Sequence, residues 1–102
     1  MPKYTRLCAV EEIAPGAGKS VHLDGRSFAV FNHGGKFFVI DDVCPHRGGS
    51  LGDGPVDAGG IVSCPWHGWR FNIATGQSPV NPTARVPCFN VRVEAGWVEA
   101  EI

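Results

Sequence analysis

Apolar residues occur along this chain in short runs that are separated by turn-forming residues. Fourteen glycines and eight prolines are spread over the 102 residues, so no stretch suits a long helix. Short apolar runs bounded by Gly, Pro, Asn and Asp are typical of β-strands. The predicted strands are Tyr4–Val10, Val21–Leu23, Arg26–Phe31, Lys36–Ile40, Trp69–Ile73, Phe89–Glu94 and Trp97–Glu101.

Turn sequences predict which strands pair. Asp24-Gly25 lies between two predicted strands, and dipeptides of this kind favour two-residue β-hairpins. Ala95-Gly96 and His33-Gly34-Gly35 predict two further hairpins. The sequence therefore predicts an antiparallel all-β sandwich, with a smaller β subdomain inserted at about residues 43–76.

Two clusters of candidate metal ligands lie within this insertion. Cys44-Pro45-His46 and Cys64-Pro65-Trp66-His67 each combine one cysteine with one histidine. Tetrahedral zinc accepts two of each ligand, and so does a [2Fe-2S] cluster with two cysteines on one iron and two histidines on the other. Zinc fingers usually take their cysteines from one element and their histidines from another. The mixed supply therefore favours the cluster, while zinc stays open.

The two clusters lie in longer motifs that resemble those of a known family. CPHRGG (Cys44 to Gly49) and CPWHGWRF (Cys64 to Phe71) are similar to the two boxes of the Rieske [2Fe-2S] family. With the flanking strands, the resemblance covers nearly the whole chain as one Rieske domain, residues 1–102. It implies one [2Fe-2S] cluster per chain, with Cys44 and Cys64 on the inner iron and His46 and His67 on the outer one.

The resemblance also implies a low reduction potential. High-potential Rieske proteins have an extra cysteine in each box, joined as a disulfide, and hydroxyl side chains that donate hydrogen bonds to sulfur. At the corresponding positions this chain has Gly49, Trp66, Trp69 and Phe71. Fewer donors to sulfur destabilise the more negative reduced state. We therefore expect a potential on the order of -150 mV, at the low end of the Rieske range.

A small, low-potential Rieske protein resembles the ferredoxin component of bacterial aromatic-ring dioxygenase systems. Such a protein takes one electron from a flavin-dependent ferredoxin reductase and passes it to a terminal oxygenase through transient contacts. We expect no catalysis by the chain itself. The oxygenase iron site needs two histidines and a carboxylate, and the two remaining histidines, His22 and His33, lie in no such motif. Trp66 and the segment 79–82 are expected to form the docking rim.

Three alternatives remain open. Within the same chemistry, the chain could be the small Rieske-like subunit of an assimilatory nitrite reductase. From a different class, it could be a zinc-binding structural or interaction module. It could also be an accessory domain of an oxygenase that is encoded on a separate chain.

Charge, hydropathy and length indicate which partners, location and domain number to expect. The formal net charge is -1 and the basic residues are scattered, so we expect no nucleic acid partner. The chain has no apolar signal core and no long apolar run, which predicts a cytoplasmic protein without a membrane anchor. Its length suits a single domain, and we expect a monomer.

Several other residues are expected to have ordinary structural roles. Cys8 and Cys88 are predicted to be unpaired thiols rather than a disulfide. Residues 16–20 resemble a phosphate loop, but Ile13 stands where that motif needs glycine, so we expect only a loop. Trp97 is predicted to lie in the core. Surface histidines are expected at His22 and His33, and solvated loop carboxylates at Asp41, Asp42, Asp53 and Asp57.

Overall fold

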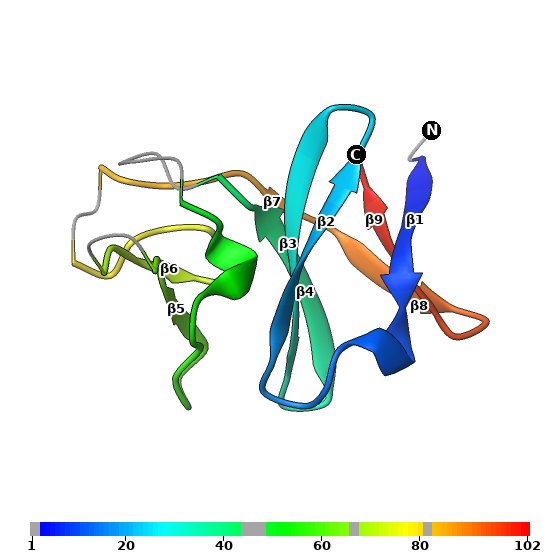
Figure 1. Cartoon of the computed structure of the whole chain (residues 1–102), viewed down its shortest axis with the longest axis horizontal. Coiled ribbons are helices and arrows are strands. Elements are labelled where there is room, and N and C mark those ends of the chain that lie inside the picture. The colour runs from blue at the N-terminus through cyan, green and yellow to red at the C-terminus, as the bar shows by residue number, and fades with distance from the viewer. Residues whose placement is uncertain (1–2, 44–48, 66–67, 81–82) are drawn as a thin grey trace.

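The computed structural model describes residues 3–43, 49–65, 68–80 and 83–102. Regular structure in these ranges is almost entirely β (Figure 1). The strands are β1 (Tyr4–Ala9), β2 (Gly18–Leu23), β3 (Arg26–His33), β4 (Lys36–Asp41), β5 (Ile61–Ser63), β6 (Arg70–Asn72), β7 (Cys88–Phe89), β8 (Val91–Glu94) and β9 (Trp97–Glu101). Two short 3-10 helices, η1 (Val10–Glu12) and η2 (Leu51–Asp53), complete the described elements.

The strands form three antiparallel sheets. One sheet has the order β1-β9-β8, and a second has the order β2-β3-β4-β7. Together they make the sandwich on the right of Figure 1, while β5 and β6 form a separate hairpin on the left. This arrangement confirms the predicted antiparallel sandwich with a smaller β subdomain inserted between β4 and β7.

Both faces of β3 are covered, which explains why four consecutive residues of this strand are buried. Phe28 and Val30 pack between the two main sheets with Val98. Ala29 and Phe31 point to the opposite face and pack against the inserted subdomain. Successive side chains of a strand point to opposite faces, so a strand covered on both sides reads as a continuous apolar run.

The predicted hairpin turns are confirmed by their backbone angles. Asp24 and Gly25 have φ values of 50° and 77°, and Ala95 and Gly96 have values of 53° and 84°. Positive φ at both central residues is the geometry whose twist matches that of the flanking strands. These turns therefore fix the β2-β3 and β8-β9 pairings locally.

The predicted strand Phe89–Glu94 is wrong, because it is divided between two sheets. Phe89 belongs to β7, which pairs with β4, whereas β8 begins at Val91 and pairs with β9. Within the β2-β3-β4-β7 sheet, Phe89 packs against Phe28, and the two rings meet edge-on with 5.4 Å between their centroids. Asn90 bridges the sheets, and its carbonyl accepts from the Glu101 amide.

Two further expectations are corrected. Trp97 is not a core residue, because 38% of it is exposed and its ring packs beneath the Arg6 guanidinium instead. The segment 16–20 is a loop only in its first part, since β2 begins at Gly18. A side chain at Gly18 would come within 2.6 Å of the Phe31 ring, so the strand requires glycine there for packing.

Candidate metal centre

Cys64 lies at the base of a tight turn that follows β5. Its amide donates to the Trp69 carbonyl at 2.6 Å, and its carbonyl accepts from the Gly68 amide at 3.1 Å. Below the turn, Ser63 pairs with Arg70 in the β5-β6 hairpin. Gly68 has a φ of +72°, a backbone conformation that residues other than glycine rarely adopt. The backbone thus fixes the position of Cys64.

The Cys64 thiol is suited to a metal. It is 2% exposed and belongs to the same buried cluster as Phe31 and Leu51. A thiolate buried in apolar surroundings is unfavourable unless a cation or another partner compensates its charge. The described part of the predicted ligand set therefore fits a metal centre.

The other three predicted ligands, Cys44, His46 and His67, lie outside the described residues. Within the described ranges no three His, Cys, Asp or Glu side chains converge as a metal site would require. Of the two remaining histidines, His22 is exposed and hydrogen-bonds Ser27. His33 is partly buried beside Gly60, so the expectation that it lies at the surface holds only in part.

Residues 44–49 form the first of two segments that contain predicted ligands, here called the first cluster loop. The described residues on either side of it, 41–43 and 50–51, form its neck. Val43 and Ser50 form an isolated antiparallel bridge across the neck. The Leu51 amide donates to the Asp42 carbonyl at 2.7 Å, and the Val43 amide donates to the Asp41 carboxylate at 2.9 Å. The two ends of the segment that contains Cys44 and His46 are thus held together.

Asp42 is not the solvated carboxylate that the sequence predicted. It is only 3% exposed and accepts hydrogen bonds from the Ser20 and Ser50 hydroxyls and from the Gly52 amide. Strand periodicity offered a signal, because Asp42 continues the inward face of Phe38 and Ile40. The other three carboxylates, of Asp41, Asp53 and Asp57, are exposed or partly exposed.

Close backbone packing joins the two cluster loops. Gly54 follows η2, and a side chain there would come within 2.0 Å of the Ser63 carbonyl oxygen. The Ser63 amide also donates to the Pro55 carbonyl at 3.0 Å. The exit of the first loop therefore packs directly against the strand that leads into Cys64.

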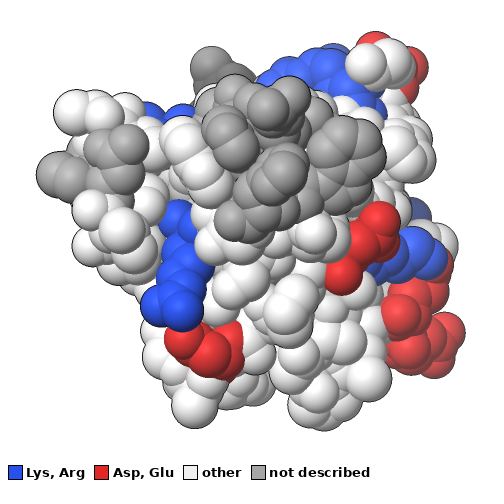
Figure 2. All heavy atoms as spheres, turned by 60° about the vertical axis from the view of Figure 1, so that its left-hand side comes forward, with Lys and Arg blue, Asp and Glu red and all other residues white. Residues whose placement is uncertain are grey.

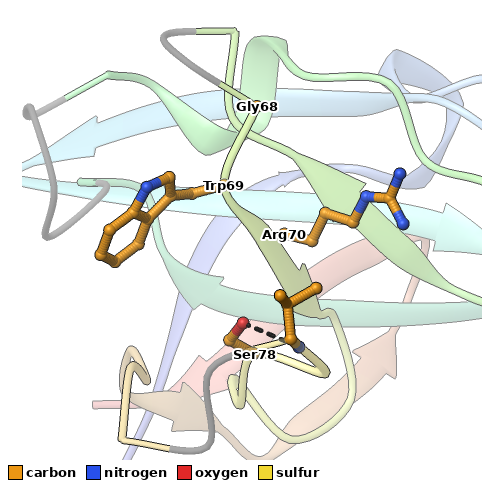
Figure 3. A pocket seen from close by; sticks show the side chains of 5 residues that line it. Gly68, Trp69, Arg70 and Ser78 are labelled. Atoms are coloured by element: carbon orange, nitrogen blue, oxygen red, sulfur yellow. Dashed lines mark hydrogen bonds between the residues drawn. The ribbon is translucent and has the colours of Figure 1, made fainter.

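A hollow of about 270 Å³ lies beside the second loop, lined by Gly68, Trp69, Arg70, Ser78 and Val80. Trp69 and Arg70 point to opposite sides of the strand, and the Val80 amide donates to the Ser78 hydroxyl at 3.2 Å (Figure 3). Val80 is 74% exposed. Figure 2 shows uncharged residues below the grey ones, with Lys, Arg, Asp and Glu side chains to the left and right of them. Trp66 and residues 81–82 of the predicted docking rim lie outside the described ranges.

The two cysteines outside the boxes are confirmed as free thiols. Cys8 is buried and Cys88 is exposed. Burial raises the pKa of the Cys8 thiol, and the nearby Glu12 carboxylate raises that pKa further against a smaller opposing effect of Lys19. Cys8 is therefore an unreactive core residue.

Comparison with known proteins identifies the centre. A family model described as the Rieske [2Fe-2S] domain matches residues 3–90. The chain belongs to the Rieske [2Fe-2S] family. Its cofactor is accordingly a [2Fe-2S] cluster. No helix in the described part of this Rieske protein is long and apolar enough to cross a membrane.

Three similar proteins show where the chain stands within the family. It is 34% identical to Ferredoxin CarAc of Metapseudomonas resinovorans, over 93% of this chain and 90% of that protein. A chain in a solved complex of reduced oxygenase and oxidized ferredoxin in carbazole 1,9a-dioxygenase matches with a TM-score of 0.85 and 31% identity. The match covers 96% of this chain and 92% of that chain. A putative NADH-dependent nitrite reductase small subunit from Mycobacterium tuberculosis matches with a TM-score of 0.88 and 26% identity, over 98% and 95%.

Proposed function

We propose that this Rieske protein is the ferredoxin of an aromatic-ring dioxygenase system, carrying single electrons from a flavin-dependent ferredoxin reductase to a terminal oxygenase. The observation that carries the proposal is the near-complete mutual coverage with a ferredoxin at 34% identity. The related ferredoxin solved together with its oxygenase supports the oxygenase as partner. Catalysis then belongs to the oxygenase, and this chain supplies electrons.

The proposal assigns the cluster ligands as Cys44 and Cys64 on the inner iron and His46 and His67 on the outer one. When bound, a cluster with this ligand set takes up and returns one electron. Among the described residues, the turn around Cys64 holds one thiolate in place. The buried side chains of Phe31, Leu51 and Phe71 keep water away from that side of the centre.

We further propose one domain over residues 1–102, with the cluster-binding subdomain at about 43–76. The protein is expected to act as a cytoplasmic monomer that docks its partners transiently. Small contacts of limited area suit electron transfer, because the partners must separate after each electron. Size-exclusion chromatography with light scattering tests the monomer, and a dimer at micromolar concentration would contradict it.

The cluster is tested by the visible spectrum of anaerobically purified protein before and after dithionite, with iron and acid-labile sulfide measured on the same sample. The expected result is a red-brown protein with about two irons and two sulfides per chain. Cys64→Ser should remove the colour, whereas the matched variant Cys88→Ser should keep it, because Cys88 is exposed and outside both boxes. A colourless protein with one zinc per chain would refute the ferredoxin assignment.

The partner is tested by electron transfer. A flavin-dependent ferredoxin reductase with NADH should reduce the loaded protein, and the reduced protein should support turnover by a ring-hydroxylating oxygenase. The similarity to a nitrite reductase small subunit at 26% identity favours one second candidate. Stable co-purification with a nitrite reductase large subunit, without reduction by the dioxygenase reductase, would establish that candidate instead.

A further inference from the structure

The neck of the first cluster loop is held by one buried side chain as well as by the backbone. The Asp42 carboxylate accepts from the Ser50 hydroxyl at 2.8 Å and from the Gly52 amide at 2.7 Å, both after the loop. The backbone carbonyl of Asp42 accepts from the Leu51 amide. Asp42, which precedes the loop, is therefore bonded to three consecutive residues that follow it.

The same carboxylate anchors the neck to the main sheet. Ser20, in the middle of β2, donates to Asp42 at 3.0 Å and also hydrogen-bonds the Ser50 hydroxyl. Gly52 lies so close to β2 that a side chain there would come within 2.7 Å of the Lys19 and Ser20 backbone. The loop neck, η2 and β2 thus meet at Asp42 without space between them.

The charge of Asp42 has no cationic partner in the described structure. Its partners in the described structure are two hydroxyls and one amide, of Ser20, Ser50 and Gly52. Burying a carboxylate at 3% exposure is costly unless its charge is compensated. Asp42 is also two residues before Cys44, so covalent geometry keeps their Cα atoms within about 7.6 Å. A negative charge at this place opposes the addition of an electron nearby.

We propose that Asp42 is a positioning residue for the iron–sulfur cluster: it fixes both ends of the first cluster loop to β2 and η2, and its buried negative charge lowers the reduction potential. This inference rests on the proposed assignment of Cys44 and His46 as ligands. The hydroxyls of Ser20 and Ser50 set how much of that charge the cluster experiences.

The test compares three variants of the cluster-loaded protein. Asp42→Asn keeps the shape and an oxygen acceptor but removes the charge. Ser50→Ala removes a donor and leaves the charge less neutralised. Asp57→Asn is the matched control, because Asp57 lies in the same subdomain and its carboxylate accepts from the Gly59 and Ile61 amides, but it is exposed. The measurements are the midpoint potential and the rate of cluster release to an iron chelator.

We expect the midpoint potential to shift in opposite directions in Asp42→Asn and Ser50→Ala. Asp42→Asn should raise the midpoint potential and Ser50→Ala should lower it, while both speed cluster release by about tenfold, the effect of one weakened buried hydrogen bond. Loosening of the loop alone would move both potentials in the same direction. The midpoint and release rate of Asp57→Asn should stay at the wild-type values.

Two outcomes would overturn the inference. One is that Asp42→Asn matches Asp57→Asn in both midpoint and release rate, and the other is that Asp42→Asn and Ser50→Ala shift the midpoint in the same direction. If Asp42→Asn fails to fold, an unchanged midpoint in Ser50→Ala also overturns it. A wild-type protein that binds no cluster would instead refute the proposed function, so the two failures are distinguishable.

Discussion

Gly54 gives a sharp test of how the cluster loops are held together. It has a φ of -84° and a ψ of 153°, which alanine adopts without strain. A methyl group there would nevertheless lie 2.0 Å from the Ser63 carbonyl oxygen. Because that atom belongs to the backbone of β5, relief requires the exit of the first loop and β5 to separate. Gly54→Ala therefore isolates packing from conformational preference.

The magnitude follows from two opposing effects. Replacing glycine by alanine at a compatible φ stabilises a protein by about 0.4–1 kcal/mol through the unfolded chain, whereas overpacking a tight interior typically costs about 1–3 kcal/mol. The contact at Gly54 is short and both sides are backbone, so we expect a net loss of about 2 kcal/mol. For a domain of this size, that loss lowers the unfolding temperature by about 8–16 °C.

Gly59→Ala is the matched control. Gly59 lies in the same subdomain, is exposed, and a side chain there would meet only the Asp57 carboxylate at 3.4 Å. It should therefore keep or slightly raise the unfolding temperature. The assay is thermal unfolding followed by far-ultraviolet circular dichroism at a fixed scan rate, with cluster absorbance recorded in parallel. If Gly54→Ala unfolds at the same temperature as Gly59→Ala, the packing between the two loops is not as tight as the structure describes.

Three further predictions concern the pH dependence of stability, thiol reactivity and the reduction potential. Hydrogen bonds from Arg92 and then from Arg6 lower the pKa of Glu99 from its ordinary value of 4.5. The ionised Glu99 side chain therefore stabilises the fold above pH 4.5, and this stabilisation is lost as pH falls through the lowered pKa. Glu99→Gln should remove this part of the acid-induced loss in a urea titration series between about pH 5 and pH 2, and an unchanged pH profile would contradict it. Iodoacetamide should label Cys88 in the native protein but leave Cys8 unmodified, because Cys8 is buried and its pKa is raised; mass spectrometry of tryptic peptides identifies the site, and labelling of both at equal rates would be inconsistent with that burial. A redox titration should give a midpoint on the order of -150 mV. A value above zero would contradict this expectation and would mean that backbone amides stabilise the reduced cluster in place of the missing hydroxyl donors.

The sequence by itself determined the features that depend on neighbouring residues. Asp24-Gly25 and Ala95-Gly96 specify hairpins because positive φ is required within the turn itself. The two boxes predict a metal site because ligand type and spacing are properties of the chain, and the resemblance to the Rieske family is confirmed. The antiparallel sandwich with its inserted subdomain followed from the same local patterns.

Only the tertiary structure decided what depends on contacts between distant segments. Alternation along a strand separates two faces, but it does not say what covers each face. Asp42 looked like a loop carboxylate until Ser20, 22 residues earlier, and η2 enclosed it. Phe89 and Val91 look like one strand, yet Phe89 pairs with β4 and packs against Phe28, whereas Val91 pairs with β9 in the other sheet. Trp97 stays at the surface because a cation covers its ring. Each outcome is a competition among partners far apart in the chain, which local sequence does not resolve.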